Sequence, residues 1–101
     1  MKIIACIADT IDELLDSAET HIECAHAKRE EYPAVAAAYY KLSLDEMASV
    51  AALHDQVTLL IADYRKTNGD PPERMMGRYE YIHEKHIAKA NKIKVLQGLF
   101  K

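Results

Sequence analysis

The sequence predicts an all-α fold, an antiparallel three-helix bundle, and two observations carry this prediction. Half of the 101 residues are hydrophobic, yet the chain has only three Gly, three Pro, one Phe and no Trp, a composition typical of helices. Turn-forming residues gather at only two places, around Pro33 and in the segment TNGDPPE, and apolar residues recur at helical spacing between them. A chain of this length forms one core, so residues 1–101 are expected to be a single domain.

The first helix is expected over residues 10 to 31. Thr10 and Glu13 have the spacing of a capping box, in which the hydroxyl accepts an early backbone N–H and the carboxylate reaches back. Pro33 should end the helix, because the residue before a proline is pushed out of the α region. The apolar positions of this helix are Ile11, Leu14, Leu15, Ala18, Ile22 and Ala25.

The second and third helices are expected over residues 33 to 66 and 71 to 100. Pro33 suits the first turn of a helix, and Gly69 can adopt the left-handed conformation that ends one. Asp70 is expected to cap the third helix, with Pro71 at its first position. Two long helices joined by a short turn pack antiparallel.

The difference in helix length predicts an uncovered surface. At 1.5 Å per residue, the second and third helices would be about 45 to 50 Å long and the first about 33 Å. One end of the long hairpin would then be left open, to be filled either by residues 1 to 9 or by a second copy of the chain. We therefore expect a homo-oligomer, with a dimer favoured, or another protein partner.

Charge and composition exclude some other classes. The net charge of −3 argues against a nucleic-acid partner, because such proteins usually carry a clustered basic excess. No apolar run approaches the ~20 residues of a membrane span, so no membrane partner is expected. Cys6 and Cys24 are far apart and without a CxxC spacing, which suggests free thiols and a cytoplasmic protein.

Two layers of the bundle are candidate metal sites. Antiparallel pairing about Pro33 makes opposed residue numbers add to about 65, which places Glu19 opposite Glu46. Such a carboxylate pair would suit a hard cation or share a proton. The open alternative is that both acids flank the core and pair with Lys or Arg of the next helix.

The second layer is rich in histidine. Pairing about Gly69 places His54 opposite His83, with His86 one turn away and Glu80 three residues before His83. Imidazole ligands suit a transition metal such as iron or zinc, although inner histidines are more often hydrogen-bonded than ligating.

Three further side chains are less favoured as metal ligands. Glu23 and His26 form another pair three residues apart, without a third ligand in view, and His21 is expected to face solvent. No Gly-rich phosphate loop or nucleophile elbow is present, so the sequence predicts no catalytic residue.

The segment from Glu19 to Gln56, ETHIECAHAKREEYPAVAAAYYKLSLDEMASVAALHDQ, resembles the first helical hairpin of ferritin-like proteins, including rubrerythrins and the small two-helix encapsulated ferritins. The whole chain also resembles small helical proteins of phages, prophages and gut bacteria. The resemblance implies that Glu19, or alternatively Glu23, is the metal ligand of the first helix and that Glu46 is the bridging carboxylate of the second. The histidine of the family's ExxH pattern falls at Ser49, so an altered or lost di-metal centre is expected.

The sequence therefore favours a non-catalytic structural or protein-interaction module that self-associates. The alternative is a metal-binding or redox protein that uses the inward-facing Glu and His residues.

Overall fold

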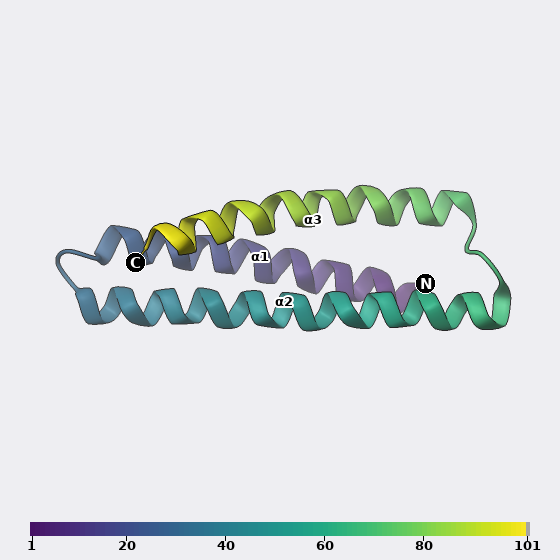
Figure 1. Cartoon of the computed structure of the whole chain (residues 1–101), viewed down its shortest axis with the longest axis horizontal. Coiled ribbons are helices and arrows are strands. Elements are labelled where there is room, and N and C mark those ends of the chain that lie inside the picture. The colour runs from purple at the N-terminus through teal and green to yellow at the C-terminus, as the bar shows by residue number, and fades with distance from the viewer. Residues whose placement is uncertain (101) are drawn as a thin grey trace.

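A computed structural model describes residues 1–100 and confirms an all-α bundle of three helices. Helix α1 spans Lys2–Lys28, α2 spans Pro33–Asn68 and α3 spans Glu73–Leu99. The helices run antiparallel in chain order, joined by two short connections at opposite ends of the molecule (Figure 1). Within the described residues there is no strand, and no helix is long and apolar enough to cross a membrane.

Helix α1 begins eight residues before the expected start, so the capping box at Thr10 is a wrong prediction. Thr10 lies inside the helix, and its hydroxyl donates to the carbonyl of Cys6 one turn earlier at 3.1 Å. The apolar spacing of Ile4, Ile7 and Ile11 continues the inner face of α1 toward the N-terminus. Burial of this face favours the helix over a local cap at Thr10.

The two connections agree more closely with expectation. Pro33 occupies the first turn of α2, and Gly69, with φ of 76°, ends it by donating its N–H to the carbonyl of Arg65 at 3.1 Å. Helix α3 starts at Glu73 rather than at residue 71, because Pro72 is extended, with ψ of 141°. No side chain caps α3, so the expected Asp70 cap is not formed.

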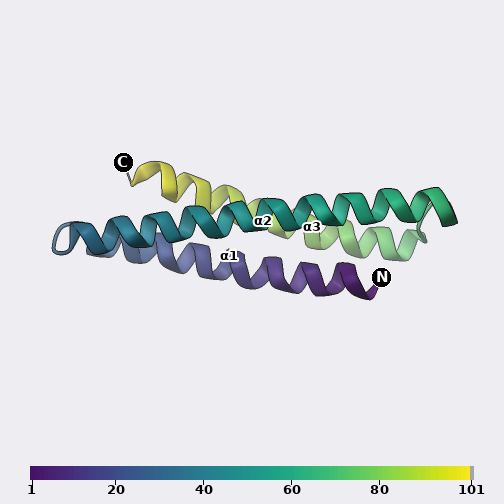
Figure 2. The same cartoon turned by 90° about the horizontal axis from the view of Figure 1, so that it is seen from below.

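Helix α1 packs along α2, and α3 packs mainly on α1. Figures 1 and 2 together show α1 behind the other two helices, while α3 and α2 lie apart at the end where the chain turns between them. Close backbone approaches between α2 and α3 are correspondingly few. The central core cluster joins all three helices and consists of Ile11, Leu15, Ala18, Val50 and Ile93.

The open end of the hairpin is lined by the N-terminal turns of α1. Residues 2 to 9 lie there as helix, and a groove of about 440 Å³ remains between α1 and α3. The groove therefore lies between α1 and α3 and does not result from a short first helix. Its apolar lining includes Met1, Ile4, Ala8, Met75, Tyr79 and Ile82.

Candidate functional site

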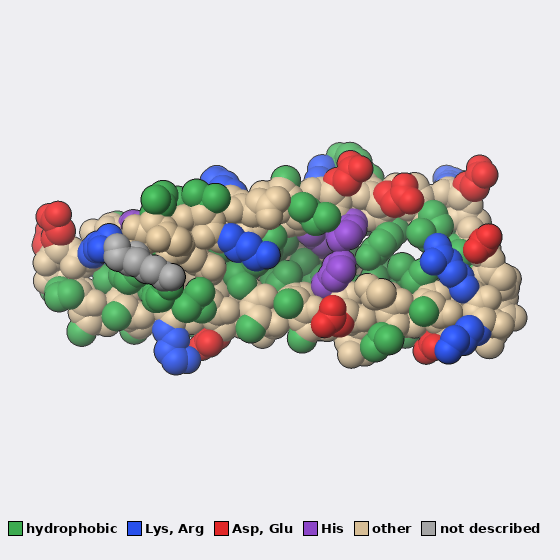
Figure 3. Space-filling view, in the orientation of Figure 1, with side chains coloured by type: hydrophobic (Ala, Val, Ile, Leu, Met, Phe, Trp, Pro, Cys, Tyr) green, Lys and Arg blue, Asp and Glu red, His purple; other side chains and the backbone are tan. Residues whose placement is uncertain are grey.

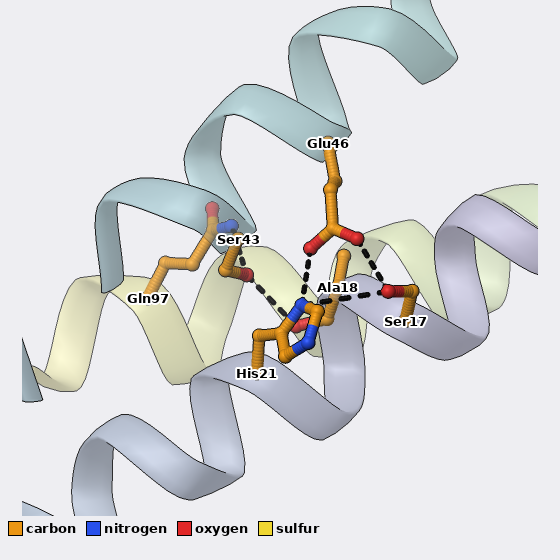
Figure 4. A network of polar contacts seen from close by, with 6 residues as sticks. All are labelled: Ser17, Ala18, His21, Ser43, Glu46 and Gln97. Atoms are coloured by element: carbon orange, nitrogen blue, oxygen red, sulfur yellow. Dashed lines mark hydrogen bonds and ion pairs between the residues drawn. The ribbon is translucent and has the colours of Figure 1, made fainter. Parts of the chain in front are cut away.

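Glu46 is the centre of a polar network between α1 and α2 (Figure 4). His21 Nδ1 donates to Glu46 Oε1 at 2.6 Å, and the Ser17 hydroxyl donates to the other carboxylate oxygen. Ser17 Oγ also lies 3.4 Å from His21 Nδ1. Only 12% of the Glu46 side chain and 24% of the His21 side chain is exposed, so solvent competes little for these hydrogen bonds.

His21 therefore does not face solvent, contrary to the sequence-based expectation. It lies one helical turn from Ser17, and its ring also contacts Tyr39 with centroids 5.7 Å apart. The signal that could have identified it is the register, because 21 and 46 add to 67, close to the predicted sum of 65. The two side chains of α1 that reach Glu46, Ser17 and His21, lie about half a turn before and after Glu19, which is the position opposed to Glu46 at a sum of 65.

Glu19 points to a different helix. Its carboxylate binds Lys92 Nζ at 2.8 Å and lies 3.9 Å from Lys89 Nζ, both on α3. The structure thus does not join Glu19 to Glu46 in one carboxylate layer. Glu19 and the partners of Glu46 lie on opposite flanks of α1. Glu19 has the lysine partners that the alternative interpretation expected, whereas Glu46 pairs with a histidine and a serine.

The network around Glu46 is built for holding helices together rather than for nucleophilic catalysis. A serine nucleophile needs a histidine nitrogen free to take its proton, with the acid on the other ring nitrogen. Here Ser17 and Glu46 both lie at Nδ1 of His21. Ser17 donates to the carboxylate, so the serine–histidine–acid relay is not formed here.

A second buried polar contact, one turn along α2, ties the three helices together. The Ser43 hydroxyl donates to the carbonyl of Ala18 at 2.8 Å and accepts a hydrogen bond from Gln97 Nε2 at 3.0 Å (Figure 4). Both Ser43 and Gln97 are buried. Neither residue could be identified from the sequence, because a serine or glutamine within an apolar stripe has no pattern that distinguishes it from an exposed one.

The histidine layer is partly assembled. His54 Nε2 of α2 lies 2.9 Å from His83 Nε2 of α3, as the predicted pairing required. His86 instead donates from Nε2 to Asp12 Oδ1 at 2.6 Å, and Glu80 is exposed. Figure 3 shows histidine side chains reaching the surface in the furrow between α3 and α2.

The environment of His83 favours its neutral form. Partial burial lowers the pKa of His83, and the nearby imidazoles of His54 and His86 lower it further, while Glu84 acts in the opposite direction. Tyr79 stacks on the His83 ring with centroids 5.6 Å apart, and burial raises the pKa of its phenol. His83 is thus flanked by an aromatic ring and a second imidazole.

The expected multi-ligand metal centres are not formed as such. Among residues 1–100, no group of three or more His, Cys, Asp or Glu side chains is placed to hold a metal ion. Glu23 is exposed, and His26 donates to the carbonyl of Leu96 at 2.8 Å. The His54–His83 pair is the place where two predicted ligands do converge.

Comparisons with protein-family models, with curated proteins and with solved structures gave no match. The functional interpretation therefore depends on the surface and the polar contacts of this chain.

Proposed function

We propose that this chain is a non-catalytic protein-interaction module that self-associates. The ferritin-like relationship of its first hairpin is part of the proposal, because two-helix members of that family work as dimers. Two features support it: the surface area and an apolar stripe on α2. The surface area carries the most weight.

The molecule exposes more surface than a compact monomer of its mass. Its accessible area is 6832 Å², whereas a monomer of 11.4 kDa typically exposes about 5,800 Å². Its radius of gyration is 16.4 Å, compared with about 13 Å for a compact chain of this length. The excess of about 1,000 Å² is comparable to the roughly 800 Å² that each partner buries in a typical stable interface.

Part of this excess surface is an apolar stripe on one flank of α2. Val35, Leu42, Leu53 and Leu60 lie within about 20° of one another on a helix of 3.6 residues per turn. We call these four residues the α2 stripe. It lies about 80° to 100° around the helix from Ser43, which contacts α1 and α3, and only about 20° to 40° from Glu46, which contacts α1. The stripe therefore borders α1 and is turned away from α3.

The occupant proposed for the α2 stripe is a second copy of the chain. Val35 and Leu42 are 47% and 41% exposed, while Leu60 is half-buried and Leu53 is half-buried because it packs against the core cluster. Apolar residues at spacings of seven and eleven form a continuous seam along a helix, as in helix pairs that associate through their side chains. Two copies related by a two-fold axis bring such a seam against itself.

The experiment compares two charged substitutions on the same helix. Leu42→Lys places a cation on the α2 stripe, and we expect it to weaken self-association at least about tenfold because the lysine must be desolvated in the interface. Leu59→Lys is the matched control, because Leu59 is 57% exposed and lies about 100° around the helix from Leu42. Sedimentation velocity over a range of concentrations measures both.

The proposal fails if the wild-type chain is monomeric at all concentrations. If both variants dissociate equally, the chain self-associates by another face and the α2 stripe is the wrong surface. If the wild-type chain is monomeric but captures a different protein in a manner lost in Leu42→Lys, the stripe is an interface with another partner.

A further inference from the structure

We propose that His54 and His83 form a two-histidine site for a late first-row divalent cation, such as nickel or zinc, that links α2 to α3. This site differs from the four-residue layer expected from sequence. It does not depend on self-association, because both ligands belong to one chain.

The spacing of the two imidazoles fits cis coordination. Their Nε2 atoms are 2.9 Å apart. A cation with metal–nitrogen bonds of about 2.1 Å and a ligand angle of about 90° holds its two nitrogens about 3.0 Å apart. The distance between the two Nε2 atoms therefore already matches the distance in a cis-coordinated ion, so binding needs no movement of the backbone.

The protonation states are also compatible with a metal. In the hydrogen bond, the Nε2–H of one imidazole donates to the Nε2 lone pair of the other. When the donating imidazole takes its other tautomer, with the proton on Nδ1, the Nε2 lone pairs of both rings become free.

The neighbouring groups define which residues take part. His86 uses its Nε2 to bind Asp12 at 2.6 Å, so that nitrogen is not available as a ligand. His54, His83 and His86 line a small cavity of about 10 Å³ that also includes Val57 and Ile82, space for about one water molecule. Histidine side chains reach the surface between α2 and α3 (Figure 3), so water could complete the coordination of an ion there.

A metal in this position would act where the bundle is weakest. Helices α2 and α3 approach each other closely at few points, and the His54–His83 contact lies between their divergent ends and the Ser43–Gln97 contact. An ion bound to one ligand from each helix stabilises the folded chain, because the unfolded chain does not hold the two histidines together.

The test is calorimetric titration of the purified chain with nickel chloride, in buffer without a chelator. We expect one ion per chain, with affinity reduced at least tenfold in both His54→Gln and His83→Gln. The control is His26→Gln, which removes a histidine of α1 outside the site and should leave the affinity unchanged. Nickel is preferred to zinc because Cys6 and Cys24 are free thiols that would compete for zinc.

A second measurement covers variants that fold poorly. In the wild-type chain, nickel should broaden the imidazole NMR signals of His54 and His83 at lower metal concentration than those of His26. The proposal is overturned by the absence of nickel binding up to about 1 mM, by unchanged affinity in the His83→Gln chain, or by simultaneous broadening of all the histidine signals.

Discussion

At the scale of single residues, polar side chains occupy positions between the helices that the apolar spacing assigns to the core. Glu46 lies among apolar positions of α2 but is satisfied by Ser17 and His21. Ser43 is completely buried, with hydrogen bonds to α1 and α3. Such groups cost free energy when one partner is removed, and this makes them sensitive probes of the packing.

Ser43→Ala should lower the free energy of unfolding by about 1 to 3 kcal/mol, because the amide of Gln97 and the carbonyl of Ala18 each lose a buried hydrogen-bond partner. The matched control is Ser49→Ala, an exposed position of the same helix, where the change should stay within about 0.5 kcal/mol. Urea unfolding followed by circular dichroism measures both. Equal effects would show that Ser43 is not held as the structure has it.

The stability of the chain should depend on pH through His83. Its folded-state pKa is lowered from 6.5 by burial and by His54 and His86, while Glu84 opposes the shift. Below pH 6.5 the unfolded chain therefore binds more protons at this residue than the folded chain does. The stability contributed by neutral His83 is complete above pH 6.5 and is lost as the pH falls below it.

His83→Gln removes this titration. The free energy of unfolding of the wild-type chain minus that of the variant should be constant above pH 6.5 and should decrease toward pH 5. Urea unfolding at a series of pH values measures the difference. A difference that grows as the pH falls would mean that folding favours the charged imidazole.

At the scale of the helices, the axial register could be predicted from sequence and the rotation about each helix axis could not. The turn at Gly69 fixes which layers of α2 and α3 meet, and His54 and His83 do meet. The same reasoning placed Glu46 at the right level but opposite the wrong side chain. Glu19 and His21 are two residues apart and lie about 160° from each other around α1, so they flank its apolar stripe on opposite sides, and the axial level alone does not decide which of them meets Glu46.

The start of α1 was misjudged for a related reason. A capping box is a local signal, whereas the apolar face of residues 2 to 9 gains its stability from packing against other helices. Ile4 lines the groove beside α3, and Ile7 packs against the core cluster. Long-range burial of this kind outweighs a cap whose sequence pattern is short.

Thr10→Ala distinguishes the two starts. At an N-cap this change typically costs about 1 kcal/mol, whereas at an exposed position inside a helix it is neutral or stabilises by a few tenths of a kcal/mol. Because Thr10 is exposed and inside α1, we expect no loss of stability. Urea unfolding measures the change, and a decrease of about 1 kcal/mol in the free energy of unfolding would indicate that Thr10 is the N-cap after all.

At the scale of the whole molecule, the all-α fold and its helix order followed from few glycines, few prolines and regular apolar spacing. The shape of the outer surface could not be predicted from these patterns, because it depends on how far α3 separates from α2. The resulting rod measures 56 × 19 × 18 Å, and its exposed large side chains include Val35 and Leu42 on α2 and Val95 and Leu99 on α3. A small core and a large apolar surface together favour association.

The most direct test of self-association is the mass of the untagged wild-type chain in solution, measured by sedimentation equilibrium from about 1 to 500 µM. The account predicts that the average mass rises with concentration from 11.4 kDa toward twice that value, because the monomer exposes an interface-sized excess of surface. A mass that stays at 11.4 kDa over the whole range would contradict it.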